Sequence, residues 1–74
     1  MKDWILLHRF YDLQRAYILK AHLEAEQVPA VVVPRQSSAY PGIGGAQAEV
    51  WVRLTDGPQA TLLLDKAFDE NDNP

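Results

Sequence analysis

Hydrophobic positions along the chain group into segments, and their spacing indicates the structure of each. Trp4 to His8 is a short apolar run rich in residues that favour strands. Leu13 to Glu26 repeats its apolar residues at helical spacing and contains neither glycine nor proline. Asp12 precedes this segment as an N-cap, since its carboxylate can accept hydrogen bonds from the free N–H groups of the first turn. The pattern predicts a strand followed by a capped helix.

The predicted helix has one apolar stripe and an imperfect end. The stripe is centred on Ala16, Leu19 and Leu23 and is flanked by Ile18 and His22. Gln27 stands where a glycine would ordinarily close the helix, so we expect this end to be poorly closed. Pro29 prevents the helix from continuing.

Two further strands follow, separated by a long segment rich in glycine. The β-branched run Ala30 to Val33 predicts a strand that ends at Pro34, because proline cannot donate to a ladder. The proline also implies that this strand lies at an edge of the sheet or has a free end. Residues 35–48 hold three of the four glycines and predict an irregular loop. Residues 49–54 alternate, so they predict a strand with one face toward the core and one away from it. Val50, Val52 and Leu54 fall on the core face, and Glu49, Trp51 and Arg53 fall on the other.

The last segment predicts a second helix. Residues 55–58 combine polar capping side chains with Pro58, which suits a first helical turn. The inward stripe of this helix is Ala60, Leu63, Leu64, Ala67 and Phe68, and Leu62 falls opposite it. Residues 69–74 read as a disordered acidic tail after a single domain of residues 1–68.

The order of elements predicts an α+β fold of the ferredoxin-like βαββα type. A helix that connects the first two strands implies that these strands run parallel. The third strand then lies between them and antiparallel to both, which gives a three-stranded antiparallel or mixed sheet of order 1-3-2 with both helices on one face.

Composition and charge narrow the function classes. The chain has 74 residues, no cysteine and a net charge of −3. Without Asp69, Glu70 and Asp72 it is neutral, so nucleic-acid binding has little electrostatic support. The apolar run at the N-terminus is too short to span a membrane, and we expect a cytoplasmic protein that binds neither nucleic acid nor membrane.

Residues 16–30, A-Y-I-L-K-A-H-L-E-A-E-Q-V-P-A, carry a family resemblance. They resemble the stretch EA-x-LLK-x-LLEAEGIPA of short bacterial domains of unknown function that are described as prokaryotic signal-transducing proteins. Residues 49–52, E-V-W-V, are similar to the family's ELWV strand. The resemblance covers nearly the whole chain and implies a fold related to the nitrogen-regulatory PII proteins and a role in signal transduction. Gln27 departs from the family's glycine, and His22 from its leucine.

Catalytic and metal-binding patterns are weak. Ser37 and Ser38 are candidate nucleophiles with His8 or His22 as the base, but no motif surrounds them. The two histidines and scattered carboxylates show no usual ligand spacing. We therefore expect no enzymatic activity, no metal site and no cofactor.

The glycine-rich stretch offers one candidate site. Gly42, Gly44 and Gly45 could turn bare backbone N–H groups toward an anion, with Arg35 or Arg53 beside them. This is the alternative function, a sensor of a nucleotide or another small anion. The stretch runs into a strand rather than a helix, which favours a connection in which Tyr40 and Ile43 are adaptable partner contacts.

The sheet face without helices is the other candidate. Trp51 must point there, and Val32 is expected beside it, together with either Trp4 and Leu6 or Ile5 and Leu7. An aromatic residue on an open sheet could also stack RNA bases with help from Arg9, Arg35 and Arg53, but no RNA-binding motif is present. We expect an adaptor or regulatory domain that binds a protein, or a second copy of itself, through this face, residues 35–48 or the edge of the first strand.

Overall fold

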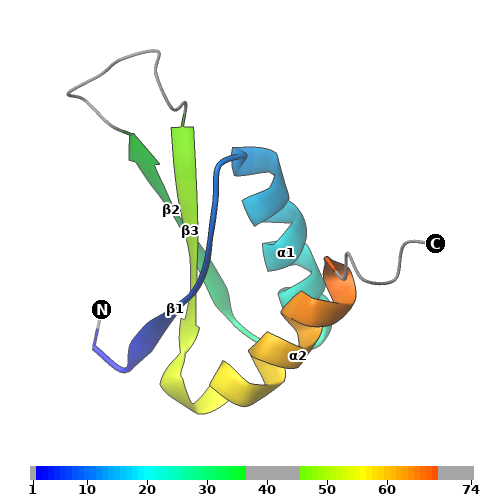
Figure 1. Cartoon of the computed structure of the whole chain (residues 1–74). Coiled ribbons are helices and arrows are strands. Elements are labelled where there is room, and N and C mark those ends of the chain that lie inside the picture. Colours follow the sequence, from blue (N-terminus) through cyan, green and yellow to red (C-terminus); the bar gives the residue numbers. More distant parts are fainter. Residues whose placement is uncertain (1, 37–45, 69–74) are drawn as a thin grey trace.

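The computed structural model describes residues 2–36 and 46–68, which form three strands and two helices (Figure 1). In chain order the elements are β1 (Trp4–Phe10), α1 (Leu13–Ala25), β2 (Ala30–Gln36), β3 (Ala46–Arg53), the 3-10 turn η1 (Leu54–Asp56) and α2 (Gly57–Ala67). This is the order that the sequence predicts.

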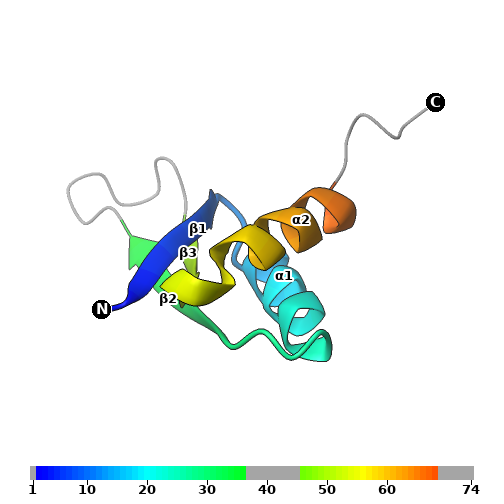
Figure 2. The same cartoon turned by 90° about the horizontal axis from the view of Figure 1, so that it is seen from below.

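The strands form one sheet with β3 in the middle, in the order β1-β3-β2. Because β3 is antiparallel to both neighbours, β1 and β2 run parallel to each other. Both helices lie on the same side of the sheet (Figure 2). The predicted ferredoxin-like βαββα arrangement is therefore confirmed, and one face of the sheet has no helix over it.

Local signals explain where α1 begins and ends. The Asp12 side chain accepts a hydrogen bond from the Gln14 N–H at 2.9 Å, as an N-cap does. At the other end, Gln27 is left-handed with φ 64°, and its N–H donates to the Glu24 carbonyl at 2.9 Å. The Val28 N–H donates to the Leu23 carbonyl at 2.9 Å, which completes a Schellman motif. The expectation of a poorly closed end is therefore wrong: Gln27 itself adopts the left-handed conformation that a glycine would take, and the closing hydrogen bonds form.

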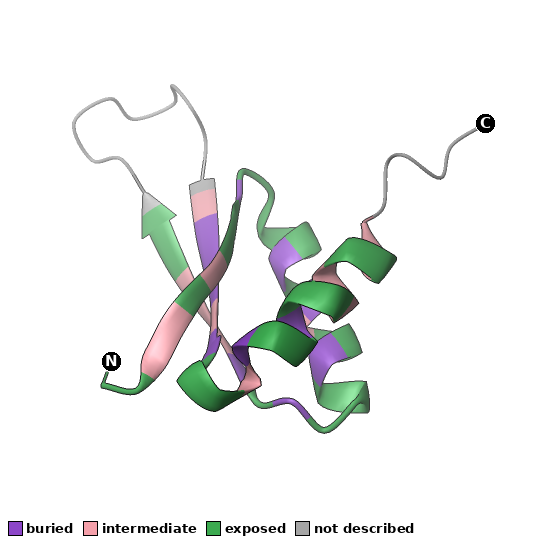
Figure 3. Cartoon of the chain, turned by 60° about the horizontal axis from the view of Figure 1, so that its bottom comes forward, coloured by how far each residue is buried: buried purple, intermediate pink, exposed green. Residues whose placement is uncertain are grey.

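The core lies between the sheet and the helices, where Figure 3 shows the buried residues. It consists of Phe10, Ala16, Leu19, Leu23, Val28, Ala30, Ala48, Val50, Val52 and Ala60. Leu63, Leu64 and Phe68 of the predicted second stripe pack against it, and the ring centroids of Phe10 and Phe68 are 5.4 Å apart. Leu62 is exposed, as its position opposite the stripe predicts.

The strand boundaries differ from the prediction at Pro34. β2 does not end there but continues to Gln36, and Pro34 lies opposite Ala48 of β3. The reason is that β2 is an edge strand with a partner on one side only, so a missing N–H is tolerated. β3 correspondingly begins at Ala46, three residues earlier than expected, and ends at Arg53. Residues 35, 36 and 46–48, predicted to belong to an irregular loop, therefore lie in strands. Leu54, expected on the core face of this strand, is instead exposed in η1, because the strand has already ended.

The start of α2 also differs in detail. Asp56 occupies the N-cap position, but its side chain makes no capping hydrogen bond and accepts one from Arg53 Nε at 3.0 Å. Gly57 follows, and a Cβ on it would lie 3.1 Å from Ile5 Cδ1. A small residue here therefore lets the start of α2 pack closely on β1.

Some predictions fall outside the described residues. These are the candidate site residues Tyr40, Gly42, Ile43, Gly44 and Gly45, the serines Ser37 and Ser38, and the tail 69–74. Within the described ranges, neither helix has the length and apolar character that crossing a membrane requires.

Candidate functional site on the open sheet face

The sheet face opposite the helices carries aromatic, aliphatic and charged side chains together. Directly paired residues of antiparallel strands share a face, so the register identifies the members of this one. They are Trp4, Leu6 and Arg9 of β1, Val31, Val33 and Arg35 of β2, and Gln47, Glu49, Trp51 and Arg53 of β3. We call this set the open face.

A β-bulge decides which residues of β1 belong to the open face. Leu6 pairs with Trp51, and the next pair is His8 with Val50, so Leu7 is an extra residue. Beyond the bulge, Arg9 pairs with Glu49. The bulge therefore places Leu6 and Arg9 on the open face.

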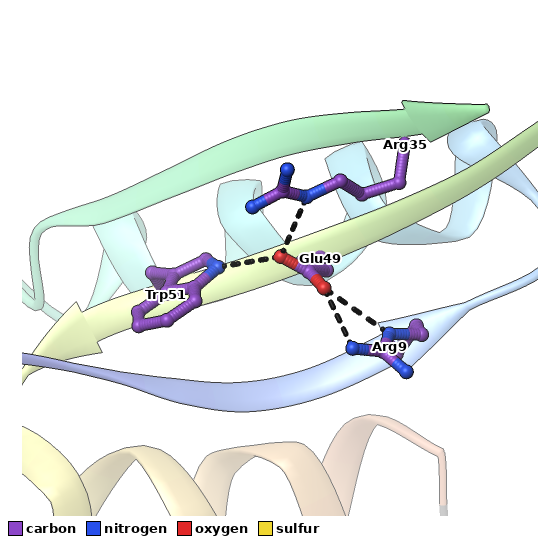
Figure 4. A network of polar contacts seen from close by, with 4 residues as sticks. All are labelled: Arg9, Arg35, Glu49 and Trp51. Atoms are coloured by element: carbon purple, nitrogen blue, oxygen red, sulfur yellow. Dashed lines mark hydrogen bonds and ion pairs between the residues drawn. The ribbon is translucent and has the colours of Figure 1, made fainter. Parts of the chain in front are cut away.

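Glu49 lies at the centre of a polar network on this face (Figure 4). Its Oε2 accepts hydrogen bonds from Arg9 Nη2 at 2.7 Å and Arg9 Nε at 3.2 Å. Its Oε1 accepts from Trp51 Nε1 at 3.1 Å and from Arg35 Nε at 3.2 Å. We call Arg9, Arg35, Glu49 and Trp51 the Glu49 network. It joins all three strands through one carboxylate.

The carboxylate of Glu49 is buried and charged. The residue is only 4% exposed, although no helix covers this face. Its pKa lies below the ordinary value of 4.5, chiefly because Arg9 and then Trp51 donate hydrogen bonds to it. Burial alone would raise the pKa, and Arg35 adds a hydrogen bond and a positive charge that lower it. At neutral pH two guanidinium groups therefore share one negative charge.

An apolar cluster adjoins the network. Trp51 on the central strand is flanked by Leu6 on one side and Val31 on the other. Trp51 and Val31 are half-buried, and Leu6 is 39% exposed. The predicted position of Trp51 opposite Val50 and Val52 agrees with this register. An indole beside exposed aliphatic groups is typical of the centre of a binding surface.

The neighbours expected for Trp51 need one correction. Val32 does not lie on the open face, because it pairs with Val50 and packs against the core. Ala30 opposite Val52 sets this register, and Val31 and Val33 take the open face instead. Of the two alternatives for the first strand, Trp4 and Leu6 share the face of Trp51, while Ile5 and Leu7 pack against the core.

The two arginines predicted for a ligand site lie in different surroundings. Arg35 belongs to the Glu49 network, whereas Arg53 Nε donates to Asp56 at 3.0 Å. Arg53 is thus paired with a carboxylate of η1. The glycines predicted to hold an anion beside these arginines lie outside the described residues.

The histidines make no cluster with other ligand types in the described part of the chain. The His8 ring lies edge-on to Phe10, with centroids 4.5 Å apart, and His22 is exposed in the last turn of α1. No group of three His, Asp or Glu side chains within residues 2–36 and 46–68 is arranged to hold a metal ion.

A second apolar surface lies on α1. Tyr17 and Ile18 are exposed on the side of the helix away from its buried stripe, and Leu13 is exposed in the first turn. The expectation that Ile18 flanks the stripe is therefore wrong. Ala21 and Ala25 are exposed on the same side, so α1 is apolar on two faces.

Sequence reasoning assigned Glu49 to the open face but missed its central role. The visible signal is a carboxylate two positions before a tryptophan on an alternating strand, where both side chains share a face. The two arginines come from other strands, and only the register and the bulge bring them to Glu49.

Comparisons with known proteins identified no relative. No family model matches the chain, and no significant match was found among the curated proteins or the solved structures. The similarity of residues 16–30 to signal-transducing domains therefore stays a prediction.

Proposed function

We propose that this chain is a regulatory or adaptor domain that binds a protein partner through the open face and performs no catalytic step of its own. The observation that carries the proposal is Trp51, whose indole lies on the uncovered side of the sheet between Leu6 and Val31. A regulatory role is also what the resemblance to signal-transducing domains implies.

The rigidity of this surface supports the proposal. Trp51 stands on the central strand, and its Nε1 is held by Glu49 at 3.1 Å. A side chain that is already fixed loses little conformational freedom when a partner covers it. Tryptophan and arginine are also the residue types that contribute most to binding energy at protein interfaces.

Site-specific photo-crosslinking tests the proposal with two matched leucines. Leu6 lies on the open face and is 39% exposed, and Leu62 lies on the outer side of α2 and is 65% exposed. Leu6→p-benzoylphenylalanine and Leu62→p-benzoylphenylalanine would each be introduced in cells that produce the protein natively. We expect a discrete protein adduct from position 6 and none from position 62, although position 62 is the more accessible.

Equal adducts from both positions, or none from position 6, would contradict the proposal. Sedimentation of the purified protein distinguishes the partners. An adduct of twice the mass of the chain, with a dimer in solution, would identify a second copy as the occupant of the open face.

A further inference from the structure

We infer that the partner of the open face is an acidic protein segment, in which carboxylate side chains stand next to an aliphatic or aromatic residue. The inference rests on the proposed function and adds the chemistry of the partner. The apolar residue would contact Trp51 and Leu6, and the carboxylates would contact Arg9 and Arg35.

The charge of the open face carries this inference. The described residues include seven basic and seven acidic side chains. Arg9, Arg35 and Arg53 lie on the open face with Glu49, and Asp56 is paired with Arg53. Three basic and two acidic side chains are therefore gathered here, which leaves four basic and five acidic residues elsewhere. The domain is therefore neutral but polarised, with its positive excess on the face that no helix covers.

The Glu49 network leaves part of this positive charge available to a ligand. Glu49 has both oxygens occupied and neutralises only one of its two arginines. The side chains of Arg9 and Arg35 are 55% and 60% exposed. Arg35 uses Nε alone on Glu49, and neither of its Nη atoms has a protein partner within the described ranges. Because a guanidinium fork matches a carboxylate, a second carboxylate can bind there without displacing Glu49.

The same charge disfavours a second copy in a face-to-face dimer. Such a dimer would bring the positive excess of one open face against that of the other, with each Glu49 already saturated. Like charges that meet in an interface cost free energy. An acidic segment meets no such repulsion.

RNA is the other anionic partner that an open sheet could take. A polyanionic backbone is attracted by a broad positive field, but the positive excess here is confined to the open face. The other described residues carry more acidic than basic side chains. In addition, the centre of the face holds a negative charge, the buried carboxylate of Glu49 that accepts a hydrogen bond from the Trp51 indole N–H. A short acidic segment needs only the two local guanidinium groups.

Selection from a displayed library of short random peptides tests the inference with the intact wild-type chain. We expect the enriched peptides to carry Asp or Glu beside an aliphatic or aromatic residue. Their affinity, measured by fluorescence anisotropy on synthetic copies, should fall as NaCl is raised, because the arginines are exposed. This readout needs no variant of the protein.

Matched variants locate the site. Arg35→Gln removes one contact to Glu49 while those of Arg9 and Trp51 persist, so the fold should survive. We expect it to weaken binding of the acidic peptides about threefold to tenfold. Arg15→Gln removes the same charge from an exposed position on α1 and should change affinity less than about twofold. Trp51→Ala, with its fold checked by circular dichroism, should abolish measurable binding.

The outcomes separate a failure of the acidic-partner inference from a failure of the proposed function. Enriched peptides that are neutral or basic, yet depend on Trp51, would overturn the acidic partner and leave the proposed function standing. Peptides that do not depend on Trp51, or no enrichment, would overturn both. Trp51-dependent binding of random-sequence single-stranded RNA without acidic peptides would assign the face to RNA and overturn the inference. A wild-type dimer that Trp51→Ala converts to a monomer would overturn it in favour of a second copy.

Discussion

Leu6 and Arg9 lie on the same face of β1, although strict alternation would put residues three positions apart on opposite faces. The extra residue Leu7 causes this, because its half-buried side chain packs against the core while the pairing resumes at His8. As a result Arg9 reaches Glu49, and Phe10 enters the core. The bulge thus contributes both to the binding surface and to the core.

Deleting His8 should leave the fold intact. Leu7 would then stand opposite Val50, and Leu6 and Arg9 would keep their present partners. The loss should be about 1 kcal/mol of unfolding free energy, which is the size of an aromatic contact such as that of His8 with Phe10. Urea denaturation followed by circular dichroism measures it.

The control for this deletion is the removal of Val32. β2 has no bulge, so the loss of one residue turns part of the strand to the wrong face. We expect at least about 3 kcal/mol of destabilisation or no folded protein. Similar losses of unfolding free energy from both deletions would show that the bulge does not accommodate a change in the length of β1.

Neighbouring valines of β2 should respond differently to the same substitution. Val32→Thr places a hydroxyl against the core and should cost about 1 to 2 kcal/mol of unfolding free energy. Val31→Thr places it on the open face beside Trp51, where water can reach it, and should cost less than about 0.5 kcal/mol. Thermal unfolding of the two variants under identical conditions checks the difference. Equal costs would contradict the assignment of the two faces.

The stability of the protein should depend on the ionisation of Glu49. Its pKa is lowered in the folded state, so the folded protein binds this proton less readily than the unfolded chain. The stabilisation is therefore complete well above the ordinary pKa of 4.5 and is lost as pH falls through the lowered value. We expect Glu49→Gln to be less stable than the wild type at neutral pH.

The difference between Glu49→Gln and the wild type should shrink as pH falls below 4.5. Chemical denaturation at a series of pH values measures it. Glu24→Gln, which removes an exposed carboxylate of α1, controls for the loss of one negative charge. A difference that stays constant down to strongly acidic pH would exclude a stabilising role for the ionised carboxylate.

Gln27→Gly should stabilise the protein. Gln27 has φ 64°, a conformation that glycine adopts without strain, and the Schellman hydrogen bonds around it are already formed. We expect a gain of about 0.5 to 1 kcal/mol in unfolding free energy. Gln27→Ala keeps the left-handed strain and should show no gain. A glycine variant no more stable than the alanine variant would mean that the glutamine is not strained here.

Much of the fold was predictable because its signals are local. Asp12 marks the start of α1, and the stripe of Ala16, Leu19 and Leu23 identifies the face that is buried completely. The boundary at Pro34 was wrong because the effect of a proline depends on whether its strand has one neighbour or two.

The candidate site was predictable in part. Alternation along β3 assigns Trp51 and Glu49 to the face opposite Val50, whatever the neighbouring strands are. It does not say which residues of β1 and β2 stand beside them. That choice depends on register, and the incorrect assignment of Val32 shows that one position changes the face.

The sequence by itself determined the order of the elements, the two buried helix stripes and the open side for Trp51, because each follows from the period of one segment. Only the tertiary structure decided that Arg9 and Arg35 meet at Glu49. Arg9 lies 40 positions from Glu49 in the chain and Arg35 lies 14. The approach of the two arginines to Glu49 depends on strand pairing and on one bulge, and neither can be predicted from the periodicity of a single strand.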